Sequence, residues 1–324
     1  MIIDILWLVF GLVLVVFGAD YLVEGSSTVA RRFGLSEFII GLTIVGMGTS
    51  APEMVVSFIG AIQGKADISI GNVVGSNIFN TLLILGVTAL ILPIPVTPEN
   101  KKRDIPMNIF ITVLLIVLGL EHTLFGIGTS DGLYRWDGAI LIAIFIGYMW
   151  MSFRQGTKDT PEVKENTEEG HKEHPIGLAI LMILGGLAAL IFGGRMFVDS
   201  ATSIASQLGV SDKFIAITIL AGGTSLPELA TCVAAAIKKK GQLALGNILG
   251  SNIFNILLIL GGSALITPLS FQGISYVDLG ALLVSALAVL TACYVGKKNL
   301  VDRLDGVLYV LLFAAYMAYL IINL

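Results

Sequence analysis

The sequence contains few charged residues. Asp, Glu, Lys and Arg make up 13% of its 324 residues, whereas about 25% is typical of a soluble domain. Hydrophobic residues make up 56%, and a soluble fold of this length cannot hide that much apolar surface because its outer face must be wet. The low charge content and the net charge of −4 also argue against a nucleic-acid binder. Composition therefore excludes an ordinary soluble enzyme.

Cysteine and histidine are also scarce. Cys232 and Cys293 both lie in apolar runs, and they form no spacing pattern for a disulfide framework or a metal site. His122 is expected at a helix end, and His171 and His174 fall in a polar segment, so all three are interpreted as solvated. Without a set of thiols or imidazoles, the sequence does not favour a zinc or copper site, and no resident cofactor is expected.

Apolar runs of about twenty residues predict ten membrane-spanning helices. The runs are 3–23, 38–62, 68–93, 105–121, 136–154, 175–197, 213–237, 242–267, 278–296 and 303–322. No basic region precedes the first run, which is therefore interpreted as a retained span and not as a signal peptide. The polar segment 154–174 is expected to be a linker.

The basic residues predict an orientation. Fifteen of the 19 lie in the loops that follow the odd-numbered spans, and the positive-inside rule assigns those loops to the cytoplasm. We therefore expect an integral multi-pass protein of the cell membrane, either an inner or a plasma membrane, with both termini outside and the linker 154–174 in the cytoplasm.

The chain repeats itself after 175 residues. Gly-Thr-Ser-Ala-Pro-Glu at 48–53 matches Gly-Thr-Ser-Leu-Pro-Glu at 223–228, and the match continues to 86 and 261 with 21 identities in 39 positions. The halves are 1–153 and 175–324, with five spans each. Because an odd number of spans reverses the second half, the sequence predicts an all-α membrane protein of two inverted five-helix repeats, the plan of many secondary transporters.

Glu53 and Glu228 are the acidic residues deep within the matched spans. An ionised carboxylate there costs about 2.5–3.5 kcal/mol unless it is compensated, and no basic residue is expected at similar depth. A proton or a bound metal cation could compensate it. A neutral carboxyl that only caps a broken helix is the structural alternative, and the retention of two symmetric carboxylates argues against it.

The residues around each glutamate predict a helix break. Glycine relaxes the backbone, and Pro52 and Pro227 cannot donate to the preceding turn. Ser50 stands at capping-box spacing from Glu53. The break is expected to free carbonyl oxygens near Gly46 and Ala221. Hydroxyl oxygens come from four further residues of the motif, Thr49, Ser50, Thr224 and Ser225.

A second repeated motif supplies the other wall of the predicted site. It reads Gly-Asn-x-x-Gly-Ser-Asn-x-x-Asn at 71–80 and again at 246–255. Helical spacing puts Ser76 with Asn80, and Ser251 with Asn255, on one helix face. For the other four asparagines of the motif, helix packing and lining of the site stay equally open. They are Asn72, Asn77, Asn247 and Asn252.

Two carboxylates with neutral oxygens favour a hard cation such as Ca²⁺ or Na⁺. The paired motifs resemble the two α-repeats of the sodium/calcium exchanger family, over nearly the whole chain. The resemblance implies a ten-helix fold in which spans 1 and 6 slide or rock against the rest, and Ca²⁺ extrusion driven by Na⁺ entry. It implies Glu53 and Glu228 as the principal ligands. The further ligands that it implies are Thr49, Ser50, Thr224, Ser225, Ser76, Ser251, Asn80, Asn255 and the carbonyls of Gly46 and Ala221.

Several alternatives and limits accompany this resemblance. Some relatives, including potassium-dependent ones, have Asp where this chain has Asn255, so we expect independence from K⁺. A Ca²⁺/H⁺ or other cation/H⁺ antiporter is the closest alternative, a channel would share the ligands, and an intramembrane aspartyl protease is a remote alternative from another class. Ca²⁺, Na⁺ and the lipid bilayer are the expected partners, with no nucleic acid and no obligatory protein partner.

Overall fold

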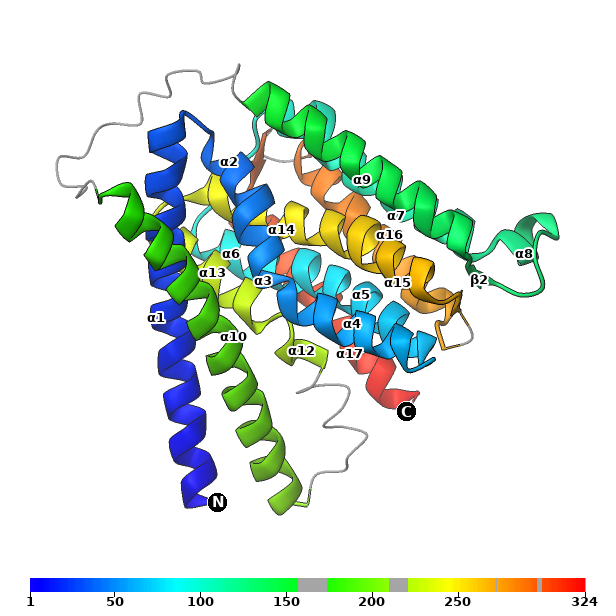
Figure 1. Ribbon diagram of the computed structural model, residues 1–324, viewed down its shortest axis with the longest axis horizontal. Coiled ribbons are helices and arrows are strands. Elements are labelled where there is room, and N and C mark those ends of the chain that lie inside the picture. Colours follow the sequence, from blue (N-terminus) through cyan, green and yellow to red (C-terminus); the bar gives the residue numbers. More distant parts are fainter. Residues whose placement is uncertain (157–173, 210–220, 272, 296–298, 324) are drawn as a thin grey trace.

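The computed structural model describes residues 1–156, 174–209, 221–271, 273–295 and 299–323, and most of these residues are helical (Figure 1). Six helices in the described ranges are long and apolar enough to cross a membrane, and a bent pair would make a seventh. The six are α1 (Ile2–Phe33), α9 (Arg135–Gly156), α10 (Ile176–Gln207), α17 (Arg303–Ile322) and the composite spans Ile68–Ile91 and Gly241–Ile266. The chain is therefore a multi-pass membrane protein.

Two further apolar helices are shorter, α13 (Leu226–Ile237) and α16 (Tyr276–Ala292). Helix α7 (Ile105–Gly119) has 15 residues. Residues 213–220 of the expected span 213–237 lie outside the described ranges. Length and composition alone thus support six or seven of the ten expected spans.

The two composite spans contain π-helical turns at matching positions. The first consists of α5 (Ala66–Ile78), η2 (Phe79–Ile84) and α6 (Leu85–Ile91). The second consists of α14 (Gly241–Ile253), η5 (Phe254–Leu260) and α15 (Gly261–Ile266). Both π segments begin directly after the second repeated motif's Ser-Asn-Ile, and π turns of this kind are frequent at functional sites.

The bent pair has α2 (Glu37–Ile40), η1 (Gly41–Val45) and α3 (Gly46–Thr49) before the bend and α4 (Ala51–Ile62) after it, at an angle of 49°. In the second half, the short α12 (Ala221–Gly223) precedes α13. The helix break predicted from the Gly-Thr-Ser-x-Pro-Glu motif is thus confirmed.

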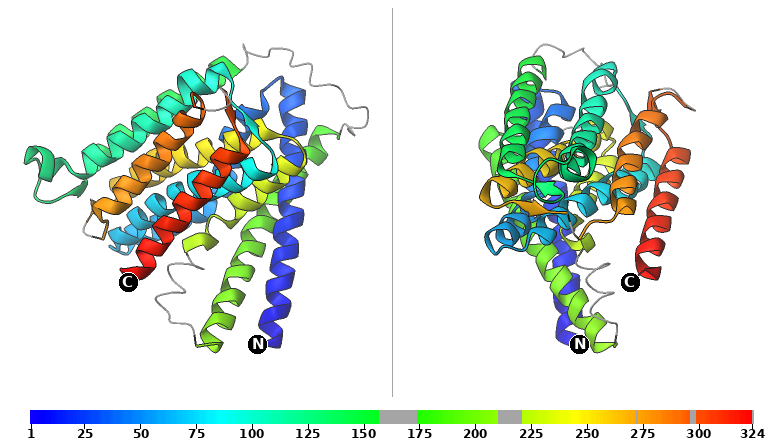
Figure 2. Two further views of the ribbon diagram at one scale, coloured as in Figure 1. Left: turned by 180° about the vertical axis from the view of Figure 1, so that it is seen from behind. Right: turned by 90° about the vertical axis from the view of Figure 1, so that its right-hand side faces the viewer.

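Helices α1 and α10 form a long antiparallel pair. A Cβ atom on Gly18 would lie 2.8 Å from the carbonyl oxygen of Gly186, and one on Gly186 would lie 2.7 Å from that of Gly18. Such contacts let two helix backbones approach closely inside a bilayer. The start of α1 and the end of α10 project beyond the other helices (Figures 1 and 2).

The pair is longer than expected. Helix α1 continues to Phe33 and α10 continues to Gln207. The apolar runs that predicted these helices end earlier, near residues 23 and 197. Arg195 therefore lies inside a helix and not at its end. Each helix is followed by a glycine with positive φ, 62° at Gly34 and 79° at Gly209, where only glycine avoids a steric penalty.

Two small ribbons join the halves of the chain. Strand β1 (Ile94–Pro95) pairs with β4 (Leu300–Val301), and β2 (Gly132–Leu133) pairs with β3 (Leu269–Ser270), both antiparallel. Two short helices, η3 (Asn100–Asp104) and α8 (Glu121–Phe125), lie near the ends of α7. Each half therefore completes a ribbon of the other, and the halves interlock.

Many polar side chains are buried inside the molecule, and many large apolar side chains lie on its surface. Trp7, Phe110, Trp150 and Leu311 are more than half exposed, as suits a surface in contact with lipid.

Cys232 and Cys293 are buried free thiols, which agrees with the expected packing role. The expectation for His174 is wrong, because its ring lies 2.8 Å from a carboxylate oxygen of Glu24 and is 19% exposed.

Candidate functional site

The two glutamates occupy equivalent positions just after the breaks. Ser50 has φ −79° and ψ 8°, and Ser225 has φ −89° and ψ 8°, so both breaks have the same backbone conformation. Each is followed by a helix with proline in its first turn, α4 or α13, which carries Glu53 or Glu228 in that turn. The partial positive charge of a helix N-terminus stabilises a carboxylate at this position.

The serines of the breaks bind the glutamates crosswise. Ser50 Oγ donates to Glu228 Oε1 at 2.9 Å, and Ser225 Oγ donates to Glu53 Oε1 at 3.0 Å. Neither serine makes a side-chain cap on its own helix, so the capping box expected from the spacing of Ser50 and Glu53 is wrong. The crosswise bonds bring residues far apart in the sequence into one site.

Both glutamates are buried, with 1% of each residue exposed. Within the described ranges, five of the predicted site residues present a buried oxygen without a hydrogen-bond partner. These atoms are Glu53 Oε2, Glu228 Oε2, Asn80 Oδ1, Asn255 Oδ1 and Thr224 Oγ1. An unsatisfied buried acceptor costs about 1–3 kcal/mol, and a cation would satisfy such acceptors. Other unpartnered oxygens, such as that of Ser263, lie outside the predicted set.

The remaining predicted hydroxyls and the carbonyl of Gly46 already have partners. Thr49 Oγ1 lies 3.1 Å from both Val45 O and Asn247 Oδ1, and Ser251 Oγ donates to Gly46 O at 3.4 Å. The carbonyl of Gly46 also accepts the Ser50 amide at 3.1 Å. The prediction that the break frees this carbonyl is therefore wrong, because α3 completes its turn before the chain bends. Ala221 begins α12.

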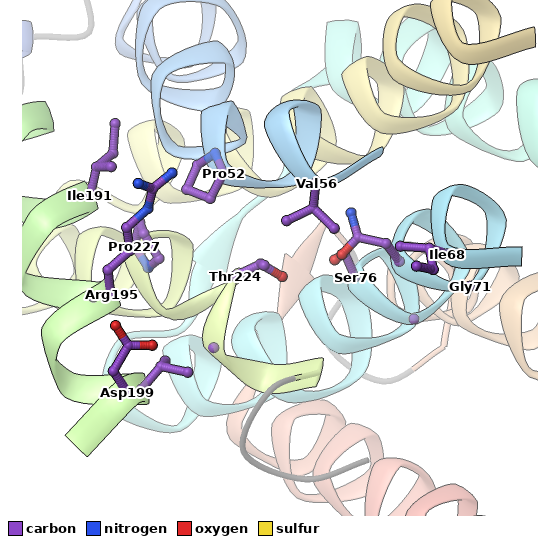
Figure 3. Close-up of a pocket in the computed structure, with 15 residues that line it drawn as sticks. Pro52, Val56, Ile68, Gly71, Ser76, Ile191, Arg195, Asp199, Thr224 and Pro227 are labelled. Atoms are coloured by element: carbon purple, nitrogen blue, oxygen red, sulfur yellow. The ribbon is translucent and has the colours of Figure 1, made fainter. Parts of the chain in front are cut away.

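A cavity of about 410 Å³ leads to one side of the site. Ser76, whose Oγ lies 3.2 Å from Ser225 Oγ, lines it together with Thr224. Figure 3 shows Arg195 and Asp199 of α10 across this cavity from Val56 and Ser76. The sequence reasoning missed Arg195 and Asp199 as cavity residues. A signal was available, because the 175-residue shift aligns them with two other charged residues, Asp20 and Glu24.

The chemistry of the site is that of oxygen ligands. In the part of the chain that the structure describes, no group of three or more His, Cys, Asp and Glu side chains could hold a metal ion. Two carboxylates, hydroxyls and carboxamides suit hard cations such as Ca²⁺ and Na⁺, whereas zinc and copper prefer nitrogen or sulfur. The arrangement fits reversible cation binding.

Known proteins resemble the chain over most of its length or nearly all of it. Inner membrane protein YrbG of Escherichia coli (strain K12) is 37% identical over 279 residues, which are 83% of this chain and 82% of YrbG. Sodium/calcium exchanger MaX1 of Methanosarcina acetivorans is 34% identical, over 98% of both chains. A solved structure of the sodium-calcium exchanger NCX_Mj, soaked with 2.5 mM Na⁺ and 0.1 mM Ca²⁺, has a TM-score of 0.83 and 32% identity and covers 98% of both chains.

The sequence profile of the family described as sodium/calcium exchanger protein matches residues 3–154 and 178–322. These ranges include both glutamates and both repeated motifs. The match, the identity to MaX1 and the structural similarity to NCX_Mj agree with one another. This chain therefore belongs to the sodium/calcium exchanger protein family.

Proposed function

We propose that this protein is a secondary active transporter that exchanges Na⁺ for Ca²⁺ across the membrane by alternating access. One observation carries the proposal: Glu53 and Glu228 are buried together at crosswise-bonded helix breaks, and each keeps one carboxylate oxygen unpartnered. Two carboxylates balance one Ca²⁺ or two Na⁺. The names of MaX1 and NCX_Mj support the same pair of ions.

The proposed ligands are the residues that the paired motifs supply. The two glutamates bind both ions, and the unpartnered oxygens of Thr224, Asn80 and Asn255 complete the shell. Ser50 and Ser225 orient the carboxylates and add hydroxyl oxygens. Neutral oxygens for the flanking sodium sites come from Thr49, Ser76, Ser251 and the carbonyls of Gly46 and Ala221.

The proposed architecture is ten helices in two inverted repeats, 1–153 and 175–324, joined by a cytoplasmic linker at 154–174. The equal lengths of α1 and α10 and the 175-residue spacing of the other matched elements support two repeats. Both chain ends shown in Figures 1 and 2 lie toward the same end of the molecule, which supports an even number of crossings. The 15 basic residues of the opposite loops assign the termini to the outside.

Alternating access would come from motion of the α1–α10 pair against the other helices. Exchange of three Na⁺ for one Ca²⁺ would move one net charge per cycle, which is worth about 2.3 kcal/mol per 100 mV. Exchange would not require K⁺, since Asn255 provides a neutral carboxamide where a carboxylate could bind a further cation. The cell membrane is the proposed location, as the name of YrbG supports.

The test is radioactive calcium uptake into proteoliposomes loaded with sodium. We expect uptake that requires an outward Na⁺ gradient, continues without K⁺ and becomes faster when the inside is positive. Uptake driven by a proton gradient instead would identify a Ca²⁺/H⁺ antiporter. Asn255→Asp is expected to change the cation dependence, and an unchanged dependence would contradict the proposed role of Asn255.

Glu53→Gln and Glu228→Gln test the site directly. Each substitution keeps the size of the side chain and removes one charge, and we expect uptake to fall by about 100-fold because ligand charge dominates Ca²⁺ affinity. Glu121→Gln is the matched control, since Glu121 is also buried and has an unpartnered Oε1 but lies in α8. Retained uptake in both site variants would refute the ligand assignment.

A further inference from the structure

Four buried asparagines connect the two repeats near η2 and η5, the segments that contact the glutamate-bearing helices α13 and α4. Asn77 and Asn252 have 2% of their surface exposed, and Asn80 and Asn255 have 1% or less. They belong to the second repeated motif, near the starts of η2 and η5. The sequence leaves open whether Asn77 and Asn252 pack helices or line the site, and their hydrogen bonds point to a different role.

Two chains of hydrogen bonds, here called relays, connect these side chains. The first relay links the backbone carbonyl of Asn252 to the side chain of Asn255. Asn77 Nδ2 donates to the carbonyl oxygen of Asn252 at 3.2 Å, and Asn255 Nδ2 donates to Asn77 Oδ1 at 2.9 Å. A backbone carbonyl only accepts, so the Asn77 amide must turn its NH₂ group toward it. Its oxygen then faces Asn255, which must present its own NH₂ group. The oxygen of Asn255 is left facing away, buried and unpartnered.

The second relay runs from a hydroxyl to Asn80. Asn252 Nδ2 donates to Thr81 Oγ1 at 2.8 Å, and Asn80 Nδ2 donates to Asn252 Oδ1 at 3.2 Å. The oxygen of Asn80 is again left buried and unpartnered. A hydroxyl can also donate, so this relay is reversible in principle, whereas the first is fixed. The asymmetry follows from the sequence, because the position that matches Thr81 in the second repeat is Ile256.

We propose that Asn77 and Asn252 are positioning residues that fix the carboxamides of Asn255 and Asn80 with their oxygens toward the transported cation. A carboxamide whose NH₂ group faced the site would repel the ion, so its orientation decides whether it is a ligand. This inference rests on the proposed cation exchange and deepens it. It also explains the crossing of the relays, since each repeat orients the ligand of the other.

The test is a double-mutant cycle between Asn77→Leu and Asn255→Asp, read as Ca²⁺ affinity by calorimetry on the purified full-length protein. Removing an orienting partner of a metal ligand costs about 10–100-fold in affinity, and we expect Asn77→Leu to cost about tenfold. In the Asn255→Asp background, the same substitution should cost about twofold or less, because a carboxylate presents an oxygen whichever way it turns. A general packing defect would cost the same in both backgrounds.

Thr81→Val provides a milder test that does not depend on the folding of Asn77→Leu. We expect it to weaken Ca²⁺ binding about threefold, the scale of one hydrogen bond. Thr88→Val is the matched control, because Thr88 is buried on the same span and its hydroxyl donates within its own helix to Ile84 O at 2.6 Å. Thermal unfolding without ions serves as the structural readout and should show that both variants are folded at the temperature of the binding measurement.

The outcomes are distinct. Equal losses for Asn77→Leu in both backgrounds, or equal affinities for Thr81→Val and Thr88→Val, would overturn the positioning role while leaving cation exchange intact. Failure of the wild type to bind Ca²⁺ would overturn the proposed function and this inference with it. A loss of Ca²⁺ affinity that Asn77→Leu causes in the wild type but not in the Asn255→Asp background would support the inference.

Discussion

The two sides of the glutamate pair carry the same motif in different surroundings. A Cβ atom on Gly246 would lie 2.2 Å from Phe38 O, and one on Gly250 would lie 2.4 Å from Leu42 O. On the matching Gly71 and Gly75, a Cβ atom would have no described atom within 4 Å, and both glycines line the cavity. The first side is closed by backbone contact, whereas on the second side both glycines line the cavity among the described residues.

The charged residues of α1 and α10 differ in the same way. On the closed side, Lys238 Nζ lies 2.7 Å from Asp20 Oδ1 and 3.3 Å from Glu24 Oε2, which ties α13 to α1. The matching residues of α10, Arg195 and Asp199, are exposed at the cavity. Among the described residues, the same motif therefore has different neighbours in the two repeats. The proposed alternating access would require such a difference between the two sides of the site.

The largest expected effect is a difference in thermal stability between alanine variants of the matched glycines Gly250 and Gly75. Gly250→Ala forces a methyl group onto the backbone of η1, and overpacking of this kind costs about 1–3 kcal/mol of stability. A methyl group at Gly75 would have no described atom within 4 Å, so Gly75→Ala should lower the thermal midpoint in detergent less than Gly250→Ala does. Equal midpoints for the two variants would show that the closed contact is not tight.

An intermediate effect is expected for the accessibility of matched positions. Val56 lines the cavity, whereas Thr231, its counterpart after the 175-residue shift, is 1% exposed. In a background without Cys232 and Cys293, a charged thiol reagent should modify the Val56→Cys protein at least about tenfold faster than the Thr231→Cys protein, because the buried site must open first. Similar rates would mean that both sides open equally often.

The smallest effect is expected for the ion pairs on the closed side. Lys238→Met removes the contacts with Asp20 and Glu24, and exposed pairs of this kind contribute about 0.2–1 kcal/mol. Labelling of the Thr231→Cys protein should then rise by at most about fivefold. Gln63→Met, at the matching position of the other repeat, is the control and should change nothing. A larger rise in the labelling rate would mean that the ion pairs of Lys238 are the main contacts that keep this side closed.

Much of the fold and the centre of the candidate site could be predicted from the sequence. Glu53 and Glu228 were identifiable because a carboxylate in a long apolar run needs compensation wherever the chain folds. The break could be predicted because Gly and Pro restrict the backbone locally. Such constraints depend on the residue and its neighbours in the sequence, and they hold in any packing state.

Partner choice could not be predicted in this way. Ser50 has the spacing to cap its own helix, but it donates to Glu228, because a buried carboxylate from the other repeat offers a stronger acceptor. The orientation of the Asn255 carboxamide depends on Asn77. Whether the carbonyl of Gly46 is free depends on the residue at which α3 ends. These are properties of one conformation, and a motif shared by both repeats cannot specify which side is closed.

The interlocked ribbons have a consequence for biosynthesis. Ile94 pairs with Val301, so β1 has no partner strand until nearly the whole chain has been translated. At about 5–20 residues per second, the delay lasts on the order of tens of seconds. During that time, the first repeat stands in the membrane with an unpaired strand and half of a charged site. Release from the insertion machinery before synthesis ends would leave both without their partners from the second repeat.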